Sequence, residues 1–325
     1  MSISKVLLLS LFFIAVAFLC TAIRLVLTPT AKIISQSDVF GFSAAQQQPF
    51  DLPELRRFKA RDGSLLAYRF YDSTAQKRLF FLHGSSYHSA AYHTLAQAIS
   101  SSGLAKVYLP NLRGHYMSGT RRGDVDYVGQ LEDDLADLMT LSHQPGSSAE
   151  TYLGGHSSGA GLAIRFAGGP HAALVNGYIL LAPVIPLAPS VKGGDAGGWA
   201  NVNEKRLYGL LALNALGISG LNGLETIAFN KPEQFWDGTE TLSYSYRLNT
   251  SYHPRYDYVS DIKSLGDKLL VLVGAEDEAI DARKLQALFK DALPEPRVEI
   301  LAGVNHFGLF TDASALVAIR SLLEQ

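Results

Sequence analysis

Cysteine is almost absent from this chain. Its 325 residues include one cysteine, Cys20, which lies within an apolar stretch near the N-terminus. Because a disulfide needs two cysteines and a cysteine-rich zinc site needs several, the sequence excludes an intrachain disulfide and a zinc site of that kind. Only Cys20 could supply a catalytic thiol, so a nucleophile elsewhere in the chain must be of another residue type.

An excess of charge of either sign is also absent. The chain has 28 Lys and Arg residues against 30 Asp and Glu residues, a net charge of -2. Proteins that bind nucleic acids usually carry a basic excess or cluster, so we expect no nucleic-acid partner. Hydrophobic residues make up 47% of the chain and charged residues 18%, which excludes general disorder. The length fits one large α/β domain with an insertion better than two unrelated domains.

A long apolar run occupies the N-terminus. Residues 6–23 carry no charge, and Arg24 alone interrupts the run before the helix-stopping Pro29. At 1.5 Å per residue, a helix of this length spans roughly 27 to 33 Å, which matches the hydrocarbon core of a bilayer. Residues 1–27 therefore predict a single-pass membrane anchor.

The alternative for this run is a signal peptide cleaved after the small residues Ala17 or Ala22, which would leave an exported soluble protein. Either cut leaves apolar residues at the new terminus, so we favour the uncleaved anchor. Because the run resembles an export signal, we expect the rest of the chain to lie outside the cytoplasm. Residues 28–54 show no clear period and are expected to form a tether.

From residue 55 onward the pattern alternates between strands and helices. Runs at 56–60 and 65–71 are joined by a short connection with Asp62-Gly63, a strong hairpin signal. Further strands are expected at 79–82, 106–109, 151–153, 177–182, 268–274 and 297–301, and helices at 90–99, 128–141, 160–167, 282–292 and 313–323. This order predicts a mostly parallel central sheet with helices on both faces.

One segment breaks this alternation, and one of the expected helices is unusually acidic. Residues 183–257 are rich in glycine and aromatic residues, and we expect them to form a cap inserted over the active site, built of helical and irregular pieces.

The helix at 128–141 carries four acidic residues. Because acids early in a helix favour its dipole and usually face water, we expect a solvated face rather than a catalytic one; these residues are Glu132, Asp133, Asp134 and Asp137.

The segment Gly155-His156-Ser157-Ser158-Gly159 lies between an expected strand and an expected helix. A Gly-x-Ser-x-Gly in that context is the sequence form of a nucleophile elbow, a turn so tight that its neighbours must be small. Ser157 is therefore the candidate nucleophile. A Gly/Ser-rich turn without chemistry is the alternative, and the rest of the chain must decide between them.

A serine nucleophile needs a general base and a group that orients the base. Asp277 and His306 each follow an expected strand, so both would emerge at the same sheet edge as Ser157, in the chain order Ser, Asp, His. We therefore predict a catalytic triad of these three residues. The other acids that could take the place of Asp277 are Asp281, Glu278 and Glu276.

On these motifs the chain resembles an α/β-hydrolase, closest in pattern to the serine-aminopeptidase or monoacylglycerol-lipase-like (lysophospholipase-like) group. The matching segments are His83-Gly84, Asn111 to His115, the elbow, Gly274-x-x-Asp277 and Asn305-His306. The family's Asp-x-Arg-Gly-His-Gly-x-Ser appears here with Asn111 in place of the aspartate and Tyr116 in place of the second glycine. The resemblance implies an α/β-hydrolase domain over residues 55–325.

The resemblance also implies an oxyanion hole made of the backbone N–H groups of Ser85 and Ser158. His83 would orient the loop that carries Ser85 rather than react. His83, His88 and His93 recur every five residues, which does not place them on one helical face, so we expect no metal site and no cofactor.

The triad predicts a two-step acyl transfer that hydrolyses a carboxylic ester. An apolar cap beside a membrane anchor favours a lipid-derived acyl ester, such as a monoacylglycerol or lysophospholipid. The same triad could serve an acyltransferase, an amidase or a carbon-carbon-bond hydrolase. A membrane-tethered binding protein that keeps the fold without the chemistry is the alternative outside enzymes.

Overall fold

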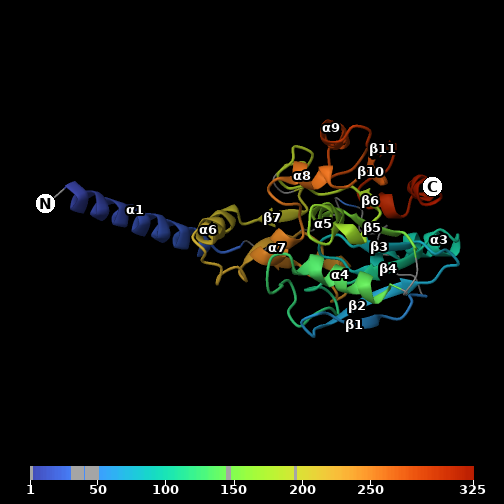
Figure 1. Ribbon diagram of the computed structural model, residues 1–325, viewed down its shortest axis with the longest axis horizontal. Coiled ribbons are helices and arrows are strands. Elements are labelled where there is room, and N and C mark those ends of the chain that lie inside the picture. Colours follow the sequence, from blue (N-terminus) through green and yellow to red (C-terminus); the bar gives the residue numbers. More distant parts are fainter. Residues whose placement is uncertain (1–2, 31–39, 41–50, 144–147, 194–195) are drawn as a thin grey trace.

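A computed structural model describes residues 3–30, 40, 51–143, 148–193 and 196–325 (Figure 1). Most of the expected tether at 28–54 lies outside these residues. The described chain consists of a long N-terminal helix and an α/β body, and the helix projects from one end of the body.

Eight strands form the central sheet, in the order β1-β2-β4-β3-β5-β6-β10-β11. The first two strands form an antiparallel hairpin, β2 is antiparallel to β4, and all the remaining neighbours are parallel. The strands are β1 (Arg56–Lys59), β2 (Leu65–Tyr71), β3 (Arg78–Leu82), β4 (Lys106–Pro110), β5 (Thr151–His156), β6 (Gly177–Leu181), β10 (Leu269–Gly274) and β11 (Arg297–Leu301).

Helices cover both faces of this sheet. Every residue of β5, β6 and β10 is buried, and successive side chains of a strand point to opposite faces, so neither face of the sheet centre meets water. α3 and α10 pack on each other, whereas α5 packs against α8. The helices of the body are α3 (His93–Ser101), α4 (Gln130–Leu141), α5 (Ser158–Ala167), α8 (Tyr258–Lys263), α9 (Ala282–Ala292) and α10 (Ala313–Leu323).

The predicted alternation is confirmed, and several bounds agree residue for residue, among them β2, β11, α9 and α10. The helix expected at 128–141 begins two residues later because Gly129, with φ 105°, takes the N-cap position. The helix expected at 90–99 is divided into a short 3-10 turn, Ser89–Tyr92, and α3.

Residues 183–257, which we call the insertion, contain a second sheet that the sequence pattern did not predict. Its three short antiparallel strands are ordered β7-β8-β9, and two helices flank them. Strands this short leave too few alternating residues to be recognised from sequence. The elements are β7 (Ala200–Val202), α6 (Glu204–Ala215), β8 (Glu225–Phe229), β9 (Ser243–Ser245) and α7 (Tyr246–Ser251).

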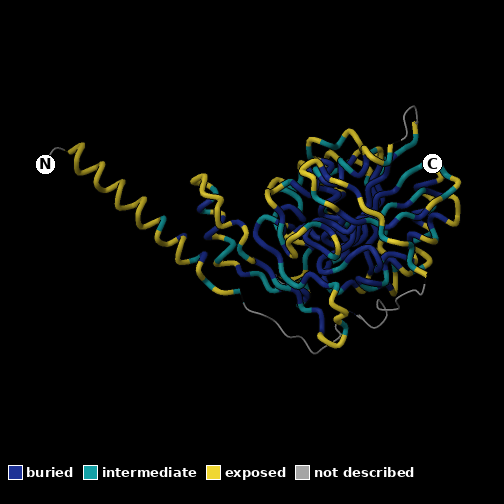
Figure 2. The backbone as a smooth tube through the Cα atoms, turned by 90° about the horizontal axis from the view of Figure 1, so that it is seen from below, coloured by how far each residue is buried: buried dark blue, intermediate teal, exposed yellow. Residues whose placement is uncertain are grey.

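The N-terminal helix α1 (Ile3–Val26) is long and apolar enough to cross a membrane. Most of its surface is exposed, and only Ala22 and Val26 are buried (Figure 2). These two residues pack against α6 of the insertion, with Leu210, Leu213 and Tyr246. The contact joins the end of α1 to the insertion rather than to the central sheet.

The expectation that the acidic residues of α4 face water is wrong for two of them. Glu132 and Asp134 are buried. The Asp134 carboxylate accepts two hydrogen bonds from the Arg113 guanidinium, at 2.7 and 2.8 Å. Glu132 accepts from Arg165 at 2.6 Å and from Arg255 at 2.8 Å. The arginine partners come from distant parts of the sequence. The position of an acid on its helix says nothing about such tertiary partners, so this pairing could not be predicted.

We expect Asp134→Ala to lower the free energy of unfolding by about 3 to 5 kcal/mol, because it removes one partner of a buried ion pair. Asp126→Ala is the control, since Asp126 is exposed and its pair with Arg121 should contribute less than about 1 kcal/mol. Urea unfolding followed by circular dichroism measures both. Equal losses in the two variants would contradict a structural role for the buried pair.

Candidate active site

Ser157 lies at the tip of the turn between β5 and α5. Its backbone has φ 57° and ψ -123°, a conformation that a residue with a side chain rarely adopts. A Cβ at Gly155 would lie 2.5 Å from the carbonyl carbon of Gly159, and a Cβ at Gly159 would lie 2.5 Å from the Leu82 and His83 carbonyl oxygens. Only glycine fits at both places, which explains the spacing of the motif.

Asp277 and His306 meet at the sheet edge where β10 and β11 end. His306 Nδ1 lies 2.8 Å from Asp277 Oδ2, and both side chains are buried. The other carboxylate oxygen, Oδ1, accepts hydrogen bonds from the backbone N–H groups of Ala279 and Ile280 at 2.9 and 2.7 Å. The carboxylate is therefore fixed from two sides and orients the imidazole.

The three other candidate acids lie elsewhere. Glu278 accepts a hydrogen bond from the backbone N–H of His306 at 3.0 Å, so it contacts the loop but not the ring. Asp281 caps the N-terminus of α9 through the N–H groups of Arg283 and Lys284. Glu276 is exposed. Asp277 alone of the four meets the His306 ring.

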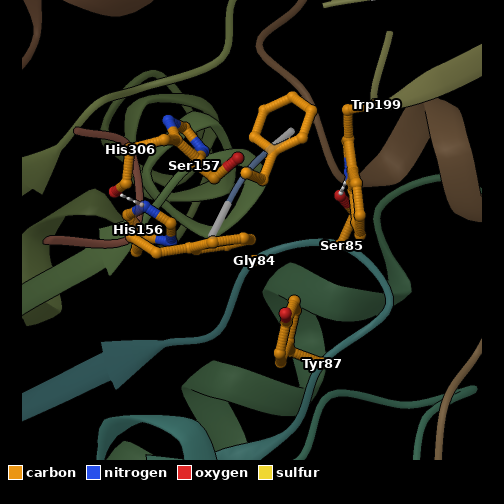
Figure 3. Close-up of a pocket in the computed structure, with 9 residues that line it drawn as sticks. Gly84, Ser85, Tyr87, His156, Ser157, Trp199 and His306 are labelled. Atoms are coloured by element: carbon orange, nitrogen blue, oxygen red, sulfur yellow. Dashed lines mark hydrogen bonds between the residues drawn. The ribbon is translucent and has the colours of Figure 1, made fainter. Parts of the chain in front are cut away.

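Ser157 and His306 line the same small pocket (Figure 3). Aromatic side chains make up much of the wall, and the cavity of about 10 Å³ has room for roughly one water molecule. Within the described chain the Ser157 hydroxyl makes no hydrogen bond to His306, as is common before a substrate is bound. The other lining residues are Phe40, Gly84, Ser85, Tyr87, His156, Trp199 and Phe307.

The loop after β3 supplies Gly84 and Ser85 to the wall of this pocket. The N–H of Gly84 donates to the Tyr92 hydroxyl at 2.9 Å, and the N–H of Ser86 donates to the Tyr244 hydroxyl at 2.8 Å. Between them, the N–H of Ser85 has no hydrogen-bond partner among the residues that the structure describes. The Ser85 hydroxyl accepts from the Trp199 indole N–H at 2.8 Å, which Figure 3 also shows.

His156 connects this loop to the loop that carries His306. Its Nε2 donates to the His306 carbonyl oxygen at 3.0 Å, and its Nδ1 accepts from the Tyr92 hydroxyl at 3.0 Å. Since the Tyr92 oxygen also accepts from Gly84, one chain of hydrogen bonds runs from Gly84 through Tyr92 and His156 to His306. Burial and the nearby His306 ring hold the pKa of His156 well below its ordinary value, which keeps the ring neutral.

Two further neutral histidines support the same loop. Leu112 N–H donates to His83 Nε2 at 3.1 Å, which leaves His83 Nδ1 to donate to the Gly84 carbonyl. His115 Nε2 lies 2.7 Å from the Tyr244 hydroxyl. Burial lowers the pKa of His83 well below its usual range and that of His115 to about 4.

The three histidines of the 83–93 segment have separate partners. His83 contacts Leu112, His88 contacts Thr239, and His93 contacts Tyr71. In the described parts of the chain, no group of three or more His, Cys, Asp or Glu side chains is arranged to hold a metal ion.

Sequence reasoning missed the residues that support the candidate site. Tyr92, Trp199 and Tyr244 belong to no motif, and two of them come from the insertion. His156 fills the variable position of the elbow, where its type carries no signal by itself. Only the fold brings these side chains to the loop after β3.

The fold, with a serine on an elbow and an Asp-His pair at the adjoining strand ends, defines the α/β-hydrolase class. The match to the family described as serine aminopeptidase, S33, covers residues 73–235, and the chain belongs to that family. The match ends before Asp277 and His306. No curated protein sequence matches the chain.

Solved structures with the same fold include three hydrolases. One is assigned as an aryl esterase from Burkholderia cenocepacia, with TM-score 0.60 and 19% identity over 84% of this chain and 100% of that one. A monoacylglycerol lipase from Paleococcus ferrophilus has TM-score 0.58 and 18% identity over 80% and 98%. A meta-cleavage product hydrolase from Pseudomonas fluorescens has TM-score 0.56 and 16% identity over 83% and 97%. These similarities establish the fold.

Histidines with a lowered pKa predict a loss of stability in mild acid. Burial lowers the pKa of His88, His115 and His253 to about 4, against about 6.5 in an unfolded chain. Between these values the unfolded state binds protons that the folded state does not, so stability falls as the pH drops below about 6.5. By pH 5 each of these residues should have cost roughly 2 kcal/mol.

His253→Gln tests this effect outside the pocket, because glutamine does not titrate. We expect the free energy of unfolding of this variant to fall by roughly 2 kcal/mol less than that of the wild type between pH 7 and pH 5. Urea unfolding at the two pH values measures the difference. The same pH dependence in both proteins would show that His253 is not held neutral.

Proposed function

We propose that the protein is a serine esterase in which Ser157, His306 and Asp277 form the catalytic triad. The observation that carries this proposal is the 2.8 Å contact between His306 Nδ1 and Asp277, at the edge of the pocket that Ser157 lines. Asp277 fixes the ring so that its Nε2 is available to Ser157. His306 takes the hydroxyl proton while the Ser157 oxygen attacks the ester carbonyl.

The oxyanion that forms on the substrate would be bound by the backbone N–H groups of Ser85 and Ser158. Ser158 opens α5, so its N–H also has the favourable end of the helix dipole behind it. The alcohol leaves with the proton from His306, and an acyl group remains on Ser157. A water molecule, activated by His306, then releases the acid and restores the serine.

The walls of the pocket favour an apolar acyl group. Phe40, Tyr87, Trp199 and Phe307 leave little free volume, so a long acyl chain must displace aromatic side chains to enter. Trp199 belongs to the insertion, which we propose acts as the cap of the site. A lipid-derived acyl ester, such as a monoacylglycerol or lysophospholipid, fits an apolar pocket in a protein with a membrane anchor.

We further propose that α1 is that anchor and is retained in the mature protein. Its exposed apolar surface suits a bilayer, and its last turns pack on the insertion, which a cleaved signal peptide has no need to do. The body would then lie outside the cytoplasm, tethered to the outer surface of the membrane. Detection of the intact N-terminal peptide in the membrane fraction by mass spectrometry tests this arrangement.

Replacing the nucleophile tests the triad most directly. We expect Ser157→Ala to lower kcat on p-nitrophenyl esters about a millionfold, because no other group can form the acyl-enzyme. A fluorophosphonate probe should label the wild type and not this variant. Asp277→Asn should lower kcat on the order of ten thousandfold. Glu278→Gln should cost far less, because Glu278 contacts the His306 backbone and the Asn305 side chain but not the His306 ring.

Near-normal hydrolysis by Ser157→Ala would contradict the proposal. Absence of both labelling and turnover in the wild type would favour a binding protein that keeps the fold without the chemistry. An acyl-length series on p-nitrophenyl esters would then define the depth of the pocket, because the length optimum reports how far the aromatic walls can open.

Tyr244→Phe tests how the insertion supports the oxyanion hole. Without the hydroxyl, the N–H of Ser86 loses its acceptor, and the adjacent N–H of Ser85 is held only from the side of Gly84. We expect kcat to fall about tenfold or more with little change in KM, because only the transition state uses that N–H. Tyr256→Phe is the control, since Tyr256 is exposed. A rise in KM at constant kcat would assign Tyr244 to substrate binding instead.

A further inference from the structure

The helix α6 and the loop after it carry an apolar surface that the α/β body does not cover. No charged residue occurs between Arg206 and Glu225. Five large apolar side chains in this stretch have exposed fractions between 41% and 59%, while Leu210 and Leu213 on the inner face are buried. We call the exposed set the α6 surface: Tyr208, Leu211, Leu216, Ile218 and Leu221.

A surface of this kind on a soluble protein is an exception that needs an explanation. Exposed helices normally carry charged residues on their outer face, and a contiguous apolar patch usually marks a binding surface. One apolar face of α6 packs on α1 and β8. The opposite face also carries large apolar side chains, and these meet solvent. The question is therefore what covers the α6 surface.

The contact between α6 and α1 shows where the α6 surface lies relative to the candidate membrane span. α6 approaches α1 so closely that a Cβ at Gly209 would lie 2.8 Å from the Ala22 carbonyl oxygen. Polar bonds fix the same junction: Arg206 Nε donates to the Val26 carbonyl oxygen at 2.9 Å, and the Asn203 amide donates to the Thr28 carbonyl oxygen at 2.9 Å. The α6 surface is thus held beside the C-terminal end of the candidate membrane span (Figures 1 and 2).

The length of α1 sets the depth of this junction. Its 24 residues extend about 36 Å, and a hydrocarbon core of about 30 Å takes up roughly 20 of them. If the exposed N-terminal part of α1 crosses the core, Ala22 and Val26 lie where the core meets the headgroups. α6 packs at this level and not farther out.

We infer that the α6 surface lies in the headgroup boundary of the same bilayer that holds α1. The inference rests on the proposed anchor and adds that the insertion itself contacts lipid. Apolar side chains at this depth are stabilised by contact with the upper part of the acyl chains, as in interfacial helices. α1 would then attach the protein to the membrane, and the contact of α6 with lipid would fix which face of the protein is turned toward the bilayer.

This position of α6 in the headgroup boundary brings the pocket close to the lipid. Trp199, which lines the pocket, directly precedes β7, and β7 leads into α6. Only residues 200–203, at about 3.3 Å each, separate Trp199 in the pocket wall from the first residue of α6. An acyl ester leaving the bilayer would have only a short path to Ser157, so the substrate class we infer is an ester that resides in the membrane.

Environment-sensitive fluorophores test the position of the α6 surface in the full-length protein. A nitrobenzoxadiazole probe is attached to Leu216→Cys or Ile218→Cys in a Cys20→Ala, Ser157→Ala background, in phosphatidylcholine vesicles. Native Cys20, labelled in the Ser157→Ala protein, reports whether α1 is in the bilayer. Val317→Cys on α10, at the far end of the body and 66% exposed, is the matched control.

If the inference holds, lipid brominated near the top of the acyl chains quenches the probes at positions 216, 218 and 20, and leaves the probe at 317 unchanged. Quenching at 20 without quenching at 216 and 218 overturns the inference and leaves the anchor intact. Quenching at none of the four removes the anchor and the inference together. Probes at 216 and 218 that are shielded from water but not quenched by brominated lipid would indicate a second copy of the chain, which also overturns it.

Activity provides an independent readout, separate from the position measurement because the fluorescence experiment uses an inactive variant. Leu216→Glu combined with Ile218→Glu should lower the ratio of activity on a long-chain monoacylglycerol in vesicles to activity on dissolved p-nitrophenyl acetate about tenfold. Val317→Glu should leave this ratio unchanged. An unchanged ratio in the double variant would contradict the role of the α6 surface, whereas loss of both activities in every protein would count against the esterase itself.

Discussion

The close packing of the Ser157 turn against the end of β3 is the constraint on which the candidate site depends. Gly159 lies against the carbonyl oxygens of Leu82 and His83, and a Cβ at Gly84 would lie 3.2 Å from the Ser157 Cβ. The nucleophile and the loop that carries Ser85 are therefore placed by the same contact. Because that contact leaves no room for side chains, it also fixes the distance between the two groups, which a flexible loop could not do.

The insertion is part of this arrangement. Tyr244 binds the backbone of Ser86, and Trp199 binds the hydroxyl of Ser85. On its other side the insertion holds α1 through α6. One small unit thus connects the loop that carries Ser85 with the candidate membrane span.

The sequence predicted the central sheet well because each of its signals is local. The strands β5, β6 and β10 are short apolar runs, and a glycine pair brackets Ser157 in a tight turn, so pattern and turn chemistry suffice. The closeness of Ser157, Asp277 and His306 then follows from topology, since parallel strands bring their carboxyl ends to one edge. The 2.8 Å contact between Asp277 and His306 agrees with that placement.

What the sequence could not predict depends on contacts between distant segments. Glu132 and Asp134 have the spacing of a solvated face, and only arginines from other elements make them buried partners. The Tyr92 and Tyr244 hydroxyls beside Ser85 carry no local signature, because neither tyrosine belongs to a motif and their contacts with this loop form only in the fold. The three-stranded sheet of the insertion is likewise held by pairing between short strands rather than by a periodic pattern.

Separate hydrogen bonds hold the backbone around Ser85 and its side chain. This separation explains how a nearly closed pocket could admit a substrate. The N–H groups on either side of Ser85 are held by Tyr92 and Tyr244, whereas Trp199 binds only its side-chain hydroxyl. In the proposed reaction, an acyl chain that displaces the Trp199 indole breaks the hydroxyl contact and leaves both backbone contacts in place. The pocket can therefore widen for substrate while the N–H of Ser85 keeps its direction, so opening the site need not weaken stabilisation of the oxyanion.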